Sequence, residues 1–466
     1  MAERIKDMTS GKPAGLLLSF ALPLMLGSIC QQLYTMVDTM VVGQVLGVEA
    51  LAALGAADWL NWMVLGIIMG FTQGFSILIS QRFGAGDEDG LRKVTAMSTL
   101  LSAVIAIVVT AGSLLATEPL LQLLNTPENI LPNSLSYLQI IFSGAAIVTA
   151  YNMMAAILRA VGDSRTPLYA MLVASVVNIG LDLLFVMVFH WGIPGAAAAT
   201  VIAQGCSCIF CLAVLHRMTL LKMRKQDWGL DWTLIRRLFQ LGIPIAFQNT
   251  VIAVGGLVVQ FVINGFGFIF VAGFTATNKL YGLLELAATS FGFSMATFAG
   301  QNLGAGKYDR IRKGMRSAIK MAVATAIAIS IVMILFGKYI LLLFISGEPE
   351  EVKAVLDVAY TYLFVMCCLL FILYLLHLYR SALQGMGDTV IPMVSGVAEL
   401  TMRIGCALLL PIWLGEYGIY FAEIAAWTGA AVILIIFYYR RIHHLLHNIP
   451  DKRIHVVRDG IVEEED

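Results

Sequence analysis

The chain has 466 residues, of which 59% are hydrophobic and 13% are charged, and its mean hydropathy is +0.84. Soluble domains usually carry about 25% charged residues, so this composition excludes a water-soluble globule and indicates a protein whose solvent is lipid. The 30 basic and 30 acidic side chains cancel, which excludes a bulk electrostatic attraction to nucleic acid.

Apolar segments long enough to cross about 30 Å of hydrocarbon, at about 1.5 Å per residue, recur along the whole chain. In chain order, the twelve predicted spans cover residues 16–45, 51–80, 95–116, 134–158, 168–190, 195–215, 238–265, 269–299, 317–345, 353–379, 390–412 and 419–439. We therefore expect an all-α polytopic membrane protein with 12 transmembrane helices.

Basic residues gather on one side of the predicted spans when the N-terminus is placed in the cytoplasm. Of the 30 basic residues, Lys338 and Lys353 fall on the outer side of the membrane, while Lys279 and Arg403 fall within spans. All the others, Arg380 included, fall in inside segments. The positive-inside rule therefore predicts a multi-pass protein of the plasma (inner) membrane with both termini in the cytoplasm.

The two halves of the chain resemble each other at an offset of about 220 residues, which indicates an internal repeat. The matching pairs are 81–86 (QRFGAG) with 301–306 (QNLGAG), Pro23 with Pro244, and 161–163 (VGD) with 386–388 (MGD). The matches fall at the same points of two sets of six spans, so we expect two six-helix lobes related by a pseudo-two-fold axis along the membrane normal. The predicted parts are an N-terminal lobe at 1–215, a basic cytoplasmic linker at 216–237, a C-terminal lobe at 238–440 and a cytoplasmic tail at 441–466.

Four polar residues fall within the predicted spans of the N-terminal lobe: Asp38, Asn178, Asp182 and Thr200. Asn178 and Asp182 share a helix face because they are four residues apart. The helical rise places Asp182 about 21 Å above the inner end of its span and Thr200 about 8 Å below the outer end. We therefore expect all four to meet in the outer half of the lobe. Two carboxylates with an amide and a hydroxyl suit Na+ or a shared proton; the alternative is ordinary hydrogen bonding between helices.

The second lobe has different residues at the positions that correspond to these four. Val259 stands opposite Asp38, Arg403 opposite Asn178, Ala407 opposite Asp182 and, roughly, Glu423 opposite Thr200. The second lobe therefore lacks the carboxylate set. A requirement of the six-helix fold would be expected in both copies, so this asymmetry favours a specialised ion site in the first.

Other charges within spans have simpler interpretations. Glu399 and Arg403 are four residues apart, so we expect them to neutralise each other on one helix. Glu285 is a second-tier candidate for an additional ion or a substrate charge. Asp58, near the outer end of its span, is a second-tier candidate that an interfacial position would also explain.

The first predicted span carries a proline and a polar stripe. Pro23 removes one backbone hydrogen bond from that helix and creates a natural bend point. Gln31, Tyr34 and Asp38 follow at helical spacing, so they line one stripe, which we assign to a substrate cavity. For Tyr34 alone, ordinary packing within the lobe is the alternative.

These features together resemble the multidrug and toxic compound extrusion (MATE) family over essentially residues 10–445. The resemblance is carried by Pro23, Asp38, Asn178 with Asp182, Thr200, the two Gly-Ala-Gly turns and the repeat. It is nearest to the bacterial and archaeal branch with a cation site in the N-terminal lobe. It implies that Asp38, Asn178, Asp182 and Thr200 bind H+ or Na+, that the first helix bends at Pro23 on ion binding, and that Gln31 and Tyr34 line the cavity.

The sequence departs from the better-known Na+-coupled members of that family at one position. Those members carry an acid in helix seven, about three turns after its proline, where this chain has Gly255. This departure argues against a Na+ site of that type in the C-terminal lobe.

The resemblance implies a secondary active exporter of small organic molecules, cationic or amphipathic, driven by H+ or Na+ antiport with alternating access. We expect no enzymatic activity, no cofactor and no nucleic-acid partner, and we expect a monomer surrounded by membrane lipid. A flippase for a lipid-linked precursor would need several cavity arginines for pyrophosphate, whereas the spans hold Arg403 and Lys279. An intramembrane aspartyl protease is suggested by GxGD at 385–388, but the same turn recurs at 160–163, so a helix-ending turn explains both copies. A passive channel would be independent of a cation gradient.

Overall fold

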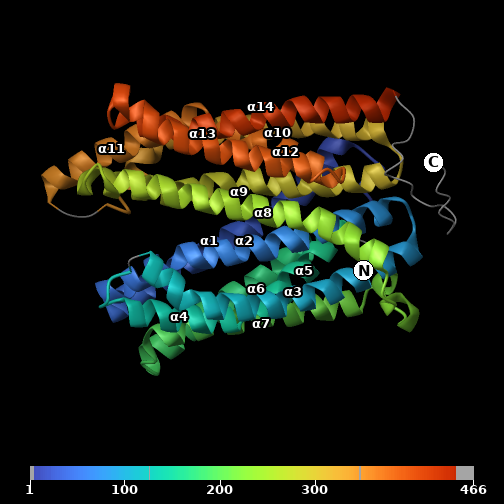
Figure 1. Ribbon diagram of the computed structural model, residues 1–466, viewed down its shortest axis with the longest axis horizontal. Coiled ribbons are helices and arrows are strands. Elements are labelled where there is room, and N and C mark those ends of the chain that lie inside the picture. The colour runs from blue at the N-terminus through green and yellow to red at the C-terminus, as the bar shows by residue number, and fades with distance from the viewer. Residues whose placement is uncertain (1–4, 125, 346–347, 448–466) are drawn as a thin grey trace.

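The computed structural model describes residues 5–124, 126–345 and 348–447, and all the regular structure in these residues is helical. The helices lie roughly side by side in a long bundle, with the first half of the chain in one layer and the second half in the other (Figure 1). The helices therefore form two lobes, one from each half of the chain, as the internal repeat predicts.

The described residues of the N-terminal lobe form seven α-helices and one π-helix. They are α1 (Pro13–Leu46), α2 (Val48–Gly84), α3 (Glu88–Leu123), α4 (Leu131–Ser143), α5 (Ala145–Ala160), α6 (Arg165–Asp182), the π-helix Leu183–Val188 and α7 (Gly192–His216). Two short 3-10 turns, Thr219–Leu221 and Lys225–Trp228, follow in the connection to the second lobe.

The C-terminal lobe repeats the arrangement. Its helices are α8 (Trp232–Asn264), α9 (Phe268–Gly304), α10 (Tyr308–Leu341), α11 (Pro349–Cys368), α12 (Leu370–Gly385), α13 (Val390–Leu414) and α14 (Tyr417–His447). The lobes meet where α2 packs against α8 and α9, and where α1 packs against α9.

Ten helices of the described chain are long and apolar enough to cross a membrane, and the number rises to 12 if each bent pair forms one span. The bent pairs are α4 with α5, at 48°, and α11 with α12, at 52°. They occupy corresponding places in the two lobes, where we predicted single spans at 134–158 and 353–379. The repeat therefore extends to the bends.

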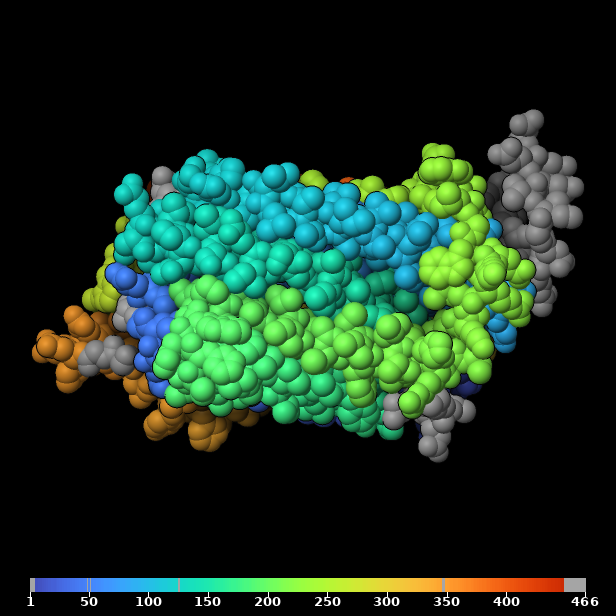
Figure 2. All heavy atoms as spheres, turned by 90° about the horizontal axis from the view of Figure 1, so that it is seen from below, coloured from blue at the N-terminus to red at the C-terminus, as the bar shows by residue number. Residues whose placement is uncertain are grey.

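The side of the bundle seen in Figure 2 consists largely of α3, α4 and α7. Large apolar side chains are exposed along two of these helices, with Ile107, Val108 and Leu115 on α3 and Ile209 and Leu212 on α7. Such a surface is stable against lipid and unstable against water. This face therefore fits the lipid-facing side of a membrane protein.

The two lobes approach most closely at the end of the bundle where α2 and α9 end, called here the termini end. A Cβ on Gly84 would lie 1.9 Å from the carbonyl oxygen of Gln301, and a Cβ on Gly304 would lie 1.9 Å from that of Gln81. Only glycine permits such an approach of one backbone to another. The two Gly-Ala-Gly turns found in the sequence thus meet each other across the lobe interface.

An N-terminal strap, residues 5–12, crosses this end of the bundle. The Met8 side chain is fully buried, its N–H donates to Gln301 Oε1 at 2.9 Å, and its carbonyl accepts from Asn302 Nδ2 at 3.0 Å. The ammonium of Lys6 donates instead to Ser19 of α1, to Oγ at 2.8 Å and to the carbonyl oxygen at 3.2 Å. The strap therefore joins the two lobes.

One predicted boundary is wrong in a way that matters for the charges. We placed Arg380 in an inside segment after a span ending at residue 379, but α12 continues to Gly385 and Arg380 is buried within it. Its partner is a glutamate 19 residues further along the chain, invisible to a local hydropathy pattern. Of the predicted tail at 441–466, residues 448–466 lie outside the described residues.

Candidate functional site

The four polar residues predicted to meet are brought together by three helices of the N-terminal lobe. Asp38 comes from α1, Asn178 and Asp182 from α6, and Thr200 from α7; we call them the N-lobe polar cluster. Asn178 Nδ2 donates to Thr200 Oγ1 at 3.4 Å, and the carboxyl groups of Asp38 and Asp182 are close enough to interact. Asp38 is 7% exposed, and Asn178 and Asp182 are fully buried.

The cluster has more hydrogen-bonding capacity than its surroundings satisfy. Within the described residues, Asp38 Oδ1, Asn178 Oδ1 and both carboxylate oxygens of Asp182 have no hydrogen-bond partner. Most buried polar atoms in proteins are bonded, and an exception calls for an explanation such as an ion. The unpaired atoms are all oxygens, and they come from two carboxyl groups and an amide, so the cluster can accept a small cation or a proton.

The helix that supplies two members of the cluster changes its winding there. Asp182 is the last residue of α6, and the π-helix Leu183–Val188 follows directly. π-Helical turns are rare and often occur at functional sites. The corresponding helix of the second lobe, α13, continues as an α-helix through this region, so the distortion is specific to the lobe with the carboxylates.

Further polar residues adjoin the cluster, some of which the sequence analysis missed. Tyr34 is buried inside the lobe, where its hydroxyl accepts from Gln204 Nε2 at 3.5 Å, and Gln31 lies exposed beside it. Tyr137 of α4 is within electrostatic reach of both Asp38 and Asp182. Gln204 stands one helical turn after Thr200 and Tyr137 is matched by Tyr362 in the repeat, so both signals were present in the sequence.

Pro23 lies inside the continuous helix α1. Because a proline has no N–H, the carbonyl of Ser19, four residues earlier, cannot make the normal helical bond. The Lys6 ammonium of the N-terminal strap supplies the missing donor at 3.2 Å. The predicted bend point is thus tied to the termini end of the bundle.

The second-tier candidates lie on other helices. Asp58 of α2 is exposed, and it is within electrostatic reach of Asp38 and of Lys279 on α9. Glu285 of α9 pairs with His377 of α12, at 3.2 Å between Oε1 and Nε2. Neither acid belongs to the N-lobe polar cluster.

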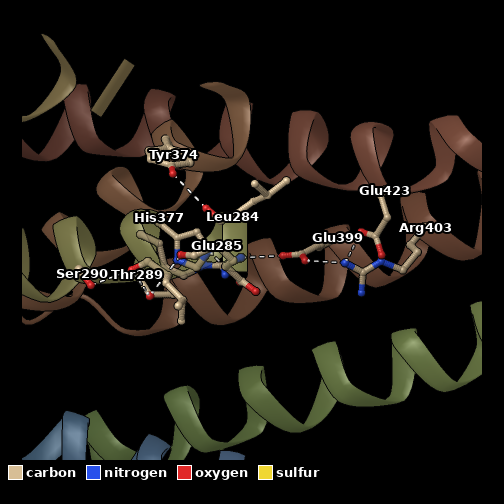
Figure 3. A network of polar contacts seen from close by, with 11 residues as sticks. Leu284, Glu285, Thr289, Ser290, Tyr374, His377, Glu399, Arg403 and Glu423 are labelled. Carbon is tan, nitrogen blue, oxygen red and sulfur yellow. Dashed lines mark hydrogen bonds and ion pairs between the residues drawn. The ribbon is translucent and has the colours of Figure 1, made fainter. Parts of the chain in front are cut away.

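The C-terminal lobe contains a chain of buried ion pairs that the sequence showed only in part, called here the C-lobe charge chain (Figure 3). Arg380 Nη2 donates to Glu399 Oε2 at 2.7 Å, and Arg403 Nη2 donates to Glu399 Oε1 at 3.0 Å. The same Arg403 nitrogen donates to Glu423 Oε2 at 2.8 Å. The predicted pairing of Glu399 with Arg403 is therefore confirmed, and each has a second partner.

The GxGD sequence has a structural explanation. Gly162 and Gly387 both have positive φ, +90° and +82°, which favours glycine. Asp163 Oδ1 accepts from the N–H of Thr166 at 2.9 Å, and Asp388 Oδ1 accepts from that of Ile391 at 3.2 Å. Both aspartates thus bond the first turn of the next helix, which accounts for the motif without a catalytic role.

The fold and the cluster together define a multi-pass, two-lobed, all-helical membrane protein with a polar site inside one lobe. The MatE family model matches residues 23–184 and 244–409. The chain therefore belongs to the MATE family.

A relative in sequence agrees with this assignment, and solved structures share the fold. A probable multidrug resistance protein, YpnP of Bacillus subtilis (strain 168), is 32% identical over 348 residues, which cover 74% of this chain and 77% of YpnP. An FAD transporter of Shewanella oneidensis is 25% identical over 417 residues, covering 86% of this chain and 88% of that protein. A solved structure described as an outward-facing multidrug resistance MATE family transporter of the MOP superfamily has a TM-score of 0.89 at 22% identity, covering 96% of this chain and 99% of its own.

Proposed function

We propose that this chain is a secondary active exporter of small organic molecules, in which a cation bound at the N-lobe polar cluster drives alternating access. The observation that carries the proposal is the pair of buried carboxyl groups, Asp38 and Asp182, with unpaired oxygens at the junction of α1, α6 and α7. Burying carboxylates without partners costs several kcal/mol unless a proton or a cation neutralises them. Loading and release of the cation therefore change the free energy of the contacts between α1, α6 and α7.

The coupling ion is H+ or Na+. A proton would be shared between the two carboxyl groups, because neighbouring carboxylates cannot both ionise without mutual repulsion. Sodium would use oxygen ligands, for which Asp38, Asp182, Asn178 and Thr200 supply carboxylate, amide and hydroxyl oxygens. About 100 mV of membrane potential contributes roughly 2.3 kcal/mol for each charge that crosses.

Helix α1 is the element through which ion binding would reach the substrate path. Asp38 lies about four turns beyond Pro23 on this helix, and the missing backbone bond at Pro23 makes that point easy to bend. We propose that cation binding from outside bends α1 and expels substrate, and that release on the inside restores it. Gln31 and Tyr34, between the proline and the aspartate, would line the substrate path.

The membrane orientation belongs to the same proposal. The basic residues in segments at the termini end favour a cytoplasmic location for that end, so the N-lobe polar cluster would lie in the outer half of the membrane. A bacterial plasma membrane would provide both the potential and the cation gradients that such an exporter needs.

A lipid-precursor flippase is the alternative with the same architecture. It would need free arginines for pyrophosphate, but the buried Arg380 and Arg403 each bond to glutamates. The relatives named for multidrug resistance and for FAD also favour export of soluble organic compounds.

The experiment is efflux of fluorescent organic cations from proteoliposomes under separately imposed pH and sodium gradients. We expect one of the two gradients to drive efflux, and we expect Asp38→Asn and Asp182→Asn to abolish the response to it. Glu118→Asn, a change at an exposed residue of α3, is the control. Unimpaired gradient-driven efflux in both aspartate variants would reject the coupling role.

A further inference from the structure

The C-terminal lobe contains a place equivalent to the N-lobe polar cluster. Helices α8, α13 and α14 repeat α1, α6 and α7, so Arg403 corresponds to Asn178 and Glu423 to Thr200. Both pairs are in contact: Asn178 bonds to Thr200 at 3.4 Å, and Arg403 bonds to Glu423 at 2.8 Å. The repeat has thus preserved the contact between the two helices while changing its chemistry.

A tyrosine marks the same equivalence independently. Tyr137 of α4 is within electrostatic reach of the N-lobe carboxyl groups. Tyr362, its counterpart in α11, is within reach of Glu423 and Arg403. Both tyrosines are buried. The two sites therefore share their surroundings as well as their helices.

The guanidinium of Arg403 occupies the centre of the second site (Figure 3). Its Nη2 lies between the carboxylates of Glu399 and Glu423, at 3.0 and 2.8 Å. Its Nη1 faces α8, where a Cβ on Gly255 would lie 3.1 Å away. Gly255 is the counterpart of Tyr34, so the space that a tyrosine fills in the first lobe is occupied by a positive charge in the second.

We propose that Arg403 is a built-in cation, which fills a latent cation site formed by Glu399 and Glu423. This inference rests on the proposed function of the N-lobe polar cluster. A guanidinium stays charged at every physiological pH, so the second site is loaded permanently. The C-terminal lobe then takes no part in cation exchange, and each transport cycle uses the N-terminal lobe alone.

The charges around the site decide what removal of Arg403 would do. Arg380 would still bond to Glu399 at 2.7 Å, so Glu423 would be the carboxylate left without a basic partner. Its side chain is only 18% exposed. The other ionisable groups near it are Glu399 of α13, Glu285 and Tyr281 of α9, and Tyr362 of α11. These groups are acids and phenols, so neutralisation would have to come from an external cation.

A purely structural role makes a different prediction. Buried ion pairs also hold helices together, and breaking one destabilises a protein whatever else it does. Loss of stability or of transport therefore cannot separate the two roles. The number of exchangeable cations can, because only a latent site gains one when the guanidinium is removed.

The experiment measures how many cations bind to the purified full-length protein, using radioactive sodium and proton uptake at constant pH. Arg403→Gln leaves an amide where the first lobe has Asn178, and we expect it to bind one more cation than the unaltered chain. Arg403→Lys keeps the positive charge and should bind no more than the unaltered chain. Arg403→Gln with Glu423→Gln removes the carboxylate and should return to the original number.

An unchanged number of cations in folded Arg403→Gln protein, checked by size-exclusion chromatography, would overturn the proposal. If that variant does not fold, the same comparison is made with Arg403→Ala. The combined variant Asp38→Asn with Asp182→Asn keeps Arg403, and we expect it to bind no sodium. If this variant still binds sodium and Glu423→Gln does not, the proposal is also overturned. Asp182→Asn alone tests the proposed N-lobe site, since it should remove a cation whatever Arg403 does.

Discussion

Gln81 and Gln301 make the same hydrogen bond in opposite directions across the lobe interface. Gln81 Nε2 of α2 donates to the carbonyl of Gly385, at the end of α12, at 3.1 Å. Gln301 Nε2 of α9 donates to the carbonyl of Ala160, at the end of α5, at 2.9 Å. Each lobe thus gives one glutamine to the other, beside the two glycines that let the backbones touch. This symmetric contact closes the termini end of the bundle.

The glycines at this contact should be essential for closure. Gly84→Ala and Gly304→Ala would each place a Cβ 1.9 Å from a carbonyl oxygen of the other lobe, so we expect both variants to favour an open termini end and to slow transport. The measurement is labelling of single cysteines near Gln81 from that side, which should become faster. Gly112→Ala, where a Cβ would meet no atom of another described helix within 4 Å, should label like the unaltered chain. Equal labelling in all three variants would contradict this account.

The Lys6 ammonium should control the bend at Pro23. Replacement by methionine keeps the length of the side chain but removes the donor to the Ser19 carbonyl, so the unpaired carbonyl should make α1 more flexible around this turn. We expect Lys6→Met to lower the transport rate several-fold, and spin labels on either side of Pro23 should report a broader range of distances. Lys12→Met, an exposed lysine at the start of α1, serves as the control. A distance distribution unchanged by Lys6→Met would count against the link.

The C-lobe charge chain should contribute far more to stability than exposed ion pairs do. Glu399 is 6% exposed and accepts from two arginines, so Glu399→Gln leaves buried positive charge without its counterion. The expected loss is about 3–5 kcal/mol of unfolding free energy, measured by thermal unfolding in detergent. Asp309 pairs with Arg312 and Lys313 at 46% exposure, so Asp309→Asn should cost about 0–1 kcal/mol. Similar losses in the two variants would show that burial is not decisive.

Asp231 should make the start of α8 sensitive to acid. The ammonium of Lys93, at 2.7 Å, and the N–H of Leu234 lower the pKa of this carboxyl group. A lowered pKa means that the contribution to stability is complete above the unfolded value of about 3.9 and is lost as the pH falls through the folded value. Asp231→Ala should cost about 1 kcal/mol through loss of the helix cap. Asp231→Asn keeps the cap and should cost less; a larger cost for asparagine would contradict this explanation.

Hydropathy and the repeat predicted the helical fold, and four polar residues at matched depth predicted a cluster that the structure brings together. Other features depend on contacts that no local pattern contains. The bends fall at Gly144 and Leu369, where α4 and α11 end inside segments that hydropathy alone predicts as single spans. Arg380 belongs to the C-lobe charge chain because it bonds to Glu399 on another helix. Tyr137 has a counterpart in the repeat, but its position beside the N-lobe polar cluster depends on how α4 packs against α2 and α7.

The N-terminal strap links the movements of the two lobes. Lys6 bonds to α1 of one lobe while Met8 is buried against α9 of the other. If the protein works by the proposed alternating access, opening of the termini end would separate these two anchors and release the strap at that step. The rate of protease cleavage between residues 6 and 8 would then report how often this end opens. A bulky fusion placed directly before the strap would slow its release and so lower the transport rate.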